Sequence, residues 1–178
     1  MRTTTAASRG RDSKQRGDAW EAQLDSYHAT LAAQRRAYIV RVPTEARVMG
    51  PTCTDARGRT SFPAVWARRA SVDYVGVLVG GRAVAMEAKT CTSPRWHFAQ
   101  ALGAPTSLAA GPEWAGLALA TECGALAAVV LQWGAECWVV EWHELQRMRA
   151  GGAASVAPEQ LASIARSIKG PQWLEGRL

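Results

Sequence analysis

The chain has 178 residues, of which 48% are hydrophobic, and this length and composition exclude a wholly disordered protein and fit one domain with a real core. Its net charge of +6 is unevenly placed, because residues 1–70 hold 13 Arg and Lys against 6 Asp and Glu, whereas the rest holds 8 against 9. The basic half favours a polyanionic partner, usually nucleic acid, although a basic surface that only keeps the protein soluble gives the same pattern.

Two other classes of protein are not expected. No apolar run is long enough to span a bilayer, and the first residues contain no hydrophobic signal core, so we expect a cytoplasmic protein with no membrane partner. The four cysteines are scattered and accompany three histidines. A structural zinc site or a disulfide framework is therefore not expected.

The chain divides into three parts. Residues 1–16 are polar and basic, and we expect a flexible arm there. Residues 17–150 form the main domain, and residues 151–178 form a linker and a final amphipathic helix. The domain opens with a predicted helix from Gly17 to about Arg36, whose apolar residues recur at helical spacing: Trp20, Leu24, Tyr27 and Leu31.

A long insertion follows the first strand, which is predicted at 37–43. Residues 44–70 have no clean period and contain two prolines, two glycines and five arginines. An ordered loop of this length is unusual and is often functional. Two interpretations stay open: the stretch RTSFPAVWARR is one arm of an extended hairpin, or the whole segment is a disordered insertion.

The remaining elements predict the fold class. A hairpin at 72–90 is followed by a loop or short helix at 93–105, and a helix at 112–123 has proline in its first turn and glycine after its end. A buried strand at 125–133, a strand at 136–142 and a short helix at 143–150 complete the domain. This order favours an α/β fold with a mixed central sheet of about five strands, flanked by helices.

Charged residues close the apolar hairpin. Asp73 opens its first strand, and Glu87 and Lys89 end the second on one face. Neighbouring carboxylates raise each other's pKa unless a cation neutralises them, and Mg²⁺ typically takes one or two carboxylates. Metal-bound water is a nucleophile near neutral pH. Because the chain has 18 arginines and three lysines, a lysine at 89 is expected for its chemistry, here phosphodiester hydrolysis.

The spacing of Asp73 and Glu87 in the sequence tests how the two strands of the hairpin pair. Opposed residues of an antiparallel hairpin have a constant sum of residue numbers, and a two-residue Gly80-Gly81 turn would put Asp73 and Glu87 on opposite faces. The acids meet only if the loop has an odd number of residues, such as Val79-Gly80-Gly81, or if a bulge intervenes. We predict the three-residue loop.

These motifs together resemble the PD-(D/E)xK nuclease core. The stretches RGDAWEAQLD (16–25), ASVDYVGV (70–77) and MEAKT (86–90) resemble the RecU-like Holliday junction resolvases. The resemblance implies a restriction-endonuclease-like fold in which residues 44–70 are a stalk-like insertion that enters the junction. Archaeal-type resolvases have a similar arrangement without the stalk. Val72 stands where the motif usually has proline. Glu113 aligns only roughly with a helical glutamine of the relatives, and no role is transferred to Glu113.

The resemblance also implies roles for individual residues. Asp73 and Glu87 would bind the metal, with Glu21 adding a carboxylate directly or through water. Lys89 would assist the attacking water, and Ser71 would touch the scissile phosphate. In the insertion, the aromatic residues Phe62 and Trp66 would stack on bases or wedge between them, or else lie in a dimer interface. Four arginines would contact phosphates: Arg57, Arg59, Arg68 and Arg69.

The resulting hypothesis is a Mg²⁺-dependent endonuclease, with Mn²⁺ able to substitute, that resolves four-way DNA junctions in recombination and repair. Paired symmetric nicks leaving 5′-phosphates require two active sites, so a homodimer is expected. Two alternatives stay open. One is a nickase or restriction-like enzyme on other DNA, and the other is a DNA-binding protein without catalysis, in which Glu87 and Lys89 form a surface pair.

Overall fold

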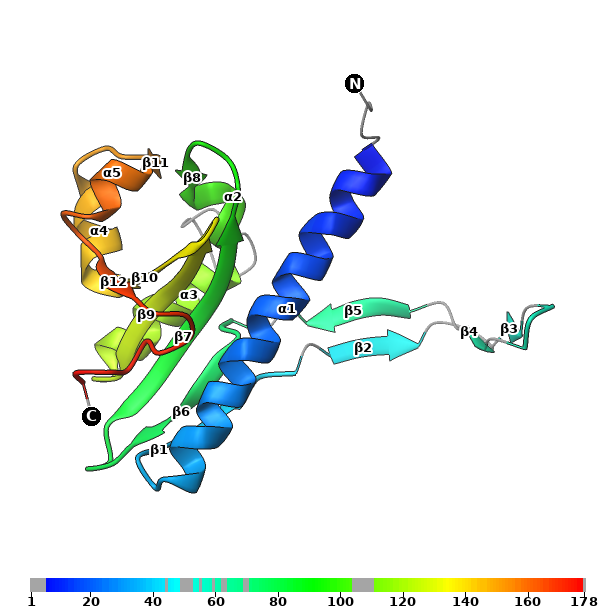
Figure 1. Ribbon diagram of the computed structural model, residues 1–178, viewed down its shortest axis with the longest axis horizontal. Helices are drawn as coiled ribbons and strands as arrows, with labels where there is room; N and C mark the ends of the chain where they lie inside the picture. Colours follow the sequence, from blue (N-terminus) through cyan, green and yellow to red (C-terminus); the bar gives the residue numbers. More distant parts are fainter. Residues whose placement is uncertain are drawn as a thin grey trace.

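A mixed sheet of six strands forms the centre of the molecule, in the order β1-β6-β7-β9-β10-β12 (Figure 1). Neighbouring strands are antiparallel except β7 and β9, which run parallel. The computed structural model describes residues 6–43, 45–48, 53–54, 56–58, 60–61, 64–68, 71–103 and 111–177. The strands of the sheet are β1 (Ala37–Arg41), β6 (Tyr74–Leu78), β7 (Ala83–Cys91), β9 (Leu126–Trp133), β10 (Glu136–Glu141) and β12 (Arg166–Ile168).

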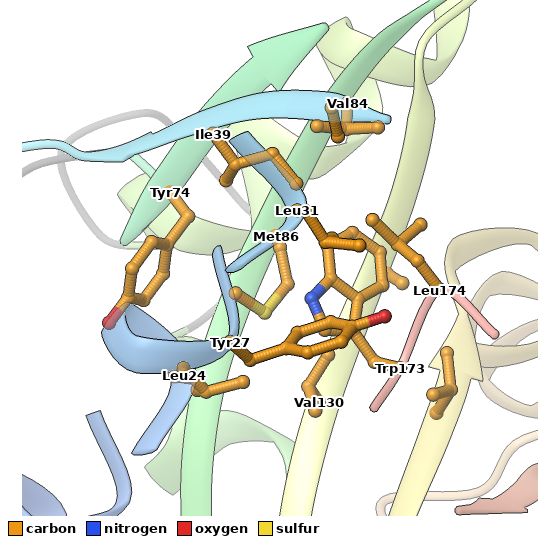
Figure 2. Close-up of a cluster of buried hydrophobic side chains, with 14 of the residues drawn as sticks. Leu24, Tyr27, Leu31, Ile39, Tyr74, Val84, Met86, Val130, Trp173 and Leu174 are labelled. Carbon is orange, nitrogen blue, oxygen red and sulfur yellow. The ribbon is translucent and has the colours of Figure 1, made fainter. Parts of the chain in front are cut away.

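One long helix, α1 (Ala6–Ala33), covers one face of the sheet. Its predicted apolar stripe is buried, and Figure 2 shows Leu24, Tyr27 and Leu31 facing the strand residues Ile39 and Met86. Burying a side chain of this size stabilises the fold by about 1.5–3 kcal/mol. The predicted stripe is therefore confirmed as the contact between helix and sheet.

The start of α1 differs from the expectation. Residues 6–16, expected as part of a flexible arm, form the first turns of the helix, which stand apart from the sheet in Figure 1. The side chains from Gly10 to Arg16 are exposed. Arg, Lys and Gln favour helical backbone without any packing contact, and Lys14 and Asp18 add an ion pair one turn apart. None of the described helices is long and apolar enough to cross a membrane.

Shorter helices cover the opposite face. The helix α3 (Pro112–Glu122) packs on β7 and β9, and α2 (Phe98–Leu102) and α4 (Trp142–Ala150) flank it. Side chains of β9 alternate between the two faces, with Val130 toward α1 and Val129 toward α3. A strand buried on both faces needs a continuous apolar run, which is the pattern of residues 125–133. Beside this layer, β8 (Trp96–His97) pairs with β11 (Ser155–Val156).

The C-terminal segment corrects one prediction. In place of a final amphipathic helix, α5 (Pro158–Leu161) makes a single turn, and β12 then pairs antiparallel with β10, so that Ile168 lies opposite Cys137. The edge of β10 offers unpaired backbone groups, and a partner strand satisfies them. Local periodicity does not show this long-range pairing, and it gives the sheet a sixth strand.

The insertion is a projecting hairpin. The strand β2 (Glu45–Val48) pairs with β5 (Ala64–Arg68), and β3 (Cys53–Thr54) pairs with β4 (Thr60–Ser61). Figure 1 shows both pairs extending away from the sheet. The described residues of the insertion therefore favour the hairpin interpretation over the disordered one.

A buried histidine joins α1 to the C-terminal segment. His28 is 3% exposed, and its Nε2 accepts a hydrogen bond of 2.9 Å from the indole N–H of Trp173. Its ring also packs edge-on against Tyr74, with 4.9 Å between ring centroids. Burial lowers the pKa of His28 to about 4, and Asp25 opposes this shift. The neutral ring is required, because a protonated Nε2 cannot accept the hydrogen bond from Trp173.

This arrangement predicts a loss of stability in mild acid. The unfolded chain binds a proton at His28 near pH 6.5, whereas the folded chain resists it to about pH 4. The contribution to the free energy of unfolding is therefore complete above pH 6.5 and falls by about 2–3 kcal/mol as the pH drops toward 4. Urea unfolding of His28→Gln, which keeps an acceptor for Trp173, should lack this part of the pH dependence. An equal slope in both proteins would contradict the assignment.

Candidate active site

The hairpin between β6 and β7 has the predicted register. Tyr74 lies opposite Met86 and Val77 opposite Ala83, and this constant sum places Asp73 opposite Glu87. The two acids, called here the acid pair, therefore lie on one face of the sheet, at the end of the hairpin away from its turn.

The turn has the odd number of residues that this register needs. The N–H of Leu78 donates to the carbonyl of Arg82 over 2.8 Å, which closes a loop of Val79, Gly80 and Gly81. Both glycines have φ of +87°, in the left-handed region that side chains with a Cβ rarely adopt. The three-residue loop is confirmed, and the glycine pair makes it possible.

Two reciprocal hydrogen bonds orient the acid pair. The backbone N–H of Asp73 donates to Oε2 of Glu87 over 3.1 Å, and the backbone N–H of Ala88 donates to Oδ2 of Asp73 over 2.9 Å. Each carboxylate is thus held by the backbone of the other strand. Lys89 forms an ion pair and hydrogen bond with Oε1 of Glu87. These contacts place all three predicted residues in one cluster.

Burial sets the electrostatics of this cluster. The Glu87 side chain is 1% exposed, whereas the Lys89 side chain is 23% exposed. Burial raises the pKa of Glu87 to about 8, and the charge of Asp73 adds to the rise while Lys89 opposes it. Burial lowers the pKa of Lys89, but the charges of Glu87 and Asp73 outweigh it and raise the pKa overall. Lys89 is therefore protonated, and even beside this charge the pKa of Glu87 stays above neutral pH.

Two further carboxylates flank the acid pair. Burial raises the pKa of Glu21 on α1, and the charge of Asp73 contributes to that rise, whereas Arg41 opposes it through an ion pair with Glu21. On the other side, the charge of Glu113 in the first turn of α3 acts on both Glu87 and Lys89. The charges of Glu21 and Asp73 thus act on each other, and the charge of Glu113 acts on Glu87.

The donor set fits a hard divalent cation that keeps several waters. Two carboxylates from paired strand ends are the number that Mg²⁺ typically takes from a protein. Within the described residues, no group of three or more Asp, Glu, His and Cys side chains could hold a metal by itself. The ion pair of Glu21 with Arg41 uses Oε2 of that carboxylate. The acid pair therefore matches the number of ligands that such a cation takes, and metal binding by the acid pair and by Glu21, directly or through water, stays a prediction.

Ser71 lies where α3 approaches the start of β6. It is exposed, and a Cβ at Gly116 would stand 2.3 Å from its carbonyl oxygen. Only glycine permits this approach, which brings the helix against the segment that leads into Asp73. Ser71 therefore lies two residues before Asp73 against α3, and its contact with a phosphate stays a prediction.

The predicted DNA-binding residues of the insertion are only partly described. Arg57 is exposed in the turn 56–58, between β3 and β4. For Trp66 and Arg68 the structure describes the backbone, which lies in β5 opposite Ala46 and Glu45. Their side chains lie outside the described residues, as do Arg59, Phe62 and Arg69.

The structure adds residues that the sequence analysis missed. A hollow of about 330 Å³ begins at Lys89 and Thr90 near the end of β7, and residues that follow β7 also line it, including Arg95, His97 and Gln100. Another hollow, of about 400 Å³, lies between α1 and the C-terminal segment, away from the acid pair. Arg41, which the sequence analysis did not single out, is close to the site through its ion pair with Glu21. Glu113, to which no role was transferred, acts on Glu87 through its charge.

The raised pKa of Glu87 predicts that the metal-free fold weakens as pH rises. The unfolded chain releases the Glu87 proton near pH 4.5 and the folded chain near 8, so the free energy of unfolding falls across that window. Glu87→Gln has no group that titrates at this position. In chelator, the free energy of unfolding of this variant relative to the parent protein should therefore rise by at least about 2 kcal/mol from pH 5 to pH 8. Chemical denaturation at both pH values measures this difference.

The exposed carboxylate Glu122, at the end of the same layer, provides the matched control. Glu122→Gln should follow the parent protein at both pH values. A pH-independent difference between Glu87→Gln and the parent protein would contradict the assignment of a raised pKa to Glu87.

The fold is similar to folds of proteins whose structures have been solved. The fold is similar to that of Hjc from Archaeoglobus fulgidus, a Holliday junction resolvase from an archaeal hyperthermophile, with a TM-score of 0.47 and 16% sequence identity. The match covers 88% of this chain and 98% of that chain. Neither a scan against protein-family models nor a search of curated proteins gives a match.

Proposed function

We propose that this protein is a divalent-metal-dependent endonuclease that cuts branched DNA, with the four-way junction as its substrate. The observation that carries the proposal is the acid pair, which two reciprocal backbone hydrogen bonds hold on one face beside the protonated Lys89. Buried carboxylates beside a lysine are costly for stability, and they persist where they serve chemistry.

The acid pair and Lys89 have separate roles. Asp73 and Glu87 would hold Mg²⁺, or Mn²⁺ in its place. The cation, when bound, supplies a nucleophilic water near neutral pH and offsets negative charge on the phosphate. Lys89, fixed by Glu87, orients the attacking water and neutralises a phosphate oxygen. Arginine is a poor replacement for Lys89. Its guanidinium is planar and binds its partners through two parallel hydrogen bonds, whereas the lysine ammonium is a compact charge.

Neighbouring residues would position the substrate. Glu21 orders a water between α1 and Asp73, and Ser71 donates a hydrogen bond to the scissile phosphate. The hollow beside Lys89 continues past Thr90 and Gln100 and has room for the next nucleotide of the strand. Hydrolysis by this route leaves 5′-phosphate and 3′-hydroxyl ends.

The projecting hairpin supports a branched substrate over a linear one. The hairpin of β2 and β5, with Arg57 in the turn between β3 and β4, leaves the sheet at the same strand ends as the acid pair, because β2 follows β1 and β5 precedes β6. Such an arm would enter the open centre of a junction, as in the RecU-like resolvases and unlike the archaeal type. Paired nicks across the junction require two copies of the chain, related by a two-fold axis.

Cleavage of a synthetic immobile four-way junction tests the proposal against linear duplex and flap DNA. With Mg²⁺, we expect paired nicks confined to the junction, and no cleavage in chelator. Asp73→Asn and Glu87→Gln should each lower the rate at least about a thousandfold, equivalent to ~4 kcal/mol. Lys89→Arg should cost about a hundredfold and Glu21→Gln about tenfold.

The control is again Glu122→Gln, which should cleave at the parent rate. Equal cleavage of linear or flapped DNA would replace the resolvase by a nickase or restriction-like enzyme. Tight junction binding without cleavage in Mg²⁺ or Mn²⁺ would leave a DNA-binding protein in which Glu87 and Lys89 are a structural pair.

Shortening the insertion separates recognition from chemistry. Replacing residues 45–68 with a short glycine-rich loop should lower the affinity for junctions at least about tenfold relative to linear duplex, because the arm no longer reaches the branch point. Asp73 and Glu87 stay in place, so nicking of a flexible or mismatched duplex should persist. Gel-shift titration and a nicking assay measure both effects. Unchanged junction preference would remove the hairpin from recognition.

A further inference from the structure

The hollow beside Lys89 has a lining that suits an anion. Two of its residues, Lys89 and Arg95, are positively charged, and three more carry hydroxyl groups: Thr90, Thr92 and Ser93. None of the ten described residues that line it is acidic, whereas the hollow of about 400 Å³ against α1 includes a glutamate. Cations and hydroxyl groups without a carboxylate are the side chains that bind phosphate oxygens in proteins.

The protein itself orients the guanidinium of Arg95. Its Nε donates to Oγ of Ser155 over 2.9 Å, and its Nη2 donates to the carbonyl of Ser155 over 3.3 Å and to Oε1 of Gln160 over 3.4 Å. Among the described residues, the other terminal nitrogen, Nη1, has no hydrogen-bond partner. A guanidinium has five N–H donors in a fixed plane, so the two donors of Nη1 are left for a ligand.

The backbone that carries Arg95 is also fixed. Oγ of Ser93 donates to the carbonyl of Arg95 over 2.7 Å, and the indole N–H of Trp133 donates to the carbonyl of Ser93 over 3.0 Å. On the other side of Arg95, β8 pairs with β11, so that His97 lies opposite Ser155, and Figure 1 shows this pair near the end of β7. A side chain whose backbone and partners are both fixed loses little conformational entropy when it binds a ligand.

A buried donor in the same lining has no partner. Trp96 is 3% exposed and lines the hollow, and its indole N–H has no hydrogen-bond partner among the described residues. Unpaired buried N–H groups are costly for stability and rare in folded proteins. This donor is a second, independent indication that the hollow takes a ligand with acceptor oxygens.

The hollow lies next to the acid pair along β7. Lys89 forms an ion pair with Glu87 and also lines the hollow, so the two sites share a residue. Cys91, at the end of β7, is four residues beyond Glu87, which is roughly 13 Å along a strand. Phosphates follow one another about every 3.4 Å of duplex axis along each DNA strand. A strand that reacts at the acid pair therefore has a flanking phosphate within reach of the hollow.

We propose that Arg95 binds a phosphate of the cleaved strand that flanks the scissile phosphate, with Ser155 and Gln160 as the residues that position Arg95. This assignment rests on the proposed function, because it places the same DNA strand in the hollow. It gives residues 155–160 of the C-terminal segment a role, which they exert through Arg95. Since the flanking phosphate is bound equally before and during the reaction, loss of Arg95 raises KM and leaves kcat nearly unchanged.

Interference by methylphosphonate tests the contact. A methylphosphonate removes the charge of one phosphate, and it is placed in turn at each position that flanks the cleavage site of a four-way junction. In the parent protein, one flanking position should lower kcat/KM about tenfold. Arg95→Gln should raise KM about tenfold on the unmodified junction. The same methylphosphonate should then change kcat/KM of this variant less than about twofold, because the phosphate no longer has its partner.

Arg82→Gln is the matched control. Arg82 is exposed at the turn end of the hairpin of β6 and β7, and its loss changes the net charge by the same amount. This variant should keep the KM and the interference profile of the parent protein. Arg95→Lys keeps the charge without the planar fork, and its KM should still rise severalfold if Arg95→Gln does not fold. Parental sensitivity at the identified position in Arg95→Gln would overturn the proposal.

Ser155→Ala tests the positioning role. The substitution removes the 2.9 Å hydrogen bond to Nε of Arg95 and keeps the backbone pairing of β11 with β8. KM should rise about threefold with kcat unchanged. In the Arg95→Gln background the same substitution should have no effect, because Ser155 acts through Arg95. Independent effects of the two substitutions on KM would contradict the positioning role.

Binding in chelator separates this proposal from the proposed function. Fluorescence anisotropy should show interference at the same position, and Arg95→Gln should lower the slope of log Kd against log salt by about one. If no DNA is cut in Mg²⁺ or Mn²⁺ but this interference depends on Arg95, the proposed function fails and the phosphate site stands. Cleavage with the same interference profile in Arg95→Gln would overturn the site and leave the proposed function. Sensitivity to removal of a flanking base, with none to its phosphate, would assign the hollow to a base and overturn the proposal.

Discussion

The register of one hairpin determines what the rest of the structure can do. Side chains alternate between the faces of a strand, so a shift of one residue would send Asp73 toward α1 and leave Glu87 alone on the opposite face. The loop of Val79, Gly80 and Gly81 fixes that register, since both glycines adopt a backbone conformation that few other residues tolerate. The two backbone hydrogen bonds that cross between Asp73 and Glu87 then hold the acids in a defined orientation.

Placing a carboxyl group at 1% exposure has a cost that the surrounding fold must offset. The central strands supply the stability: β7 lies between β6 and β9, and apolar side chains cover both of its faces. Lys89 supplies a partner for Glu87, and Glu21 and Glu113 bring negative charge from two helices on either side. A rigid sheet carrying concentrated negative charge is well suited to hold a hard cation, because the protein cannot relax to disperse the repulsion.

Two surfaces meet around this site. The projecting hairpin of β2 and β5 leaves the sheet next to it, and the polar hollow beyond Lys89 continues from it. They differ in chemistry: the hairpin carries Arg57 in the turn between β3 and β4, and the hollow is lined mainly by polar side chains. Two surfaces of different chemistry thus adjoin the cluster of Asp73, Glu87 and Lys89.

The sequence by itself determined the parts that local rules govern. Helical spacing gave the buried stripe of α1, the apolar run gave β9, and the glycine pair with the numbering of Asp73 and Glu87 gave the three-residue loop. Only the tertiary structure decided that residues 166–168 form a sixth strand on β10, that Glu113 and Arg41 join the site, and that one face of β1 and β6 stays exposed. The physical reason is range: periodicity and turn geometry act between residues close in the chain, whereas edge pairing, charge coupling and surface coverage depend on segments that meet only after folding.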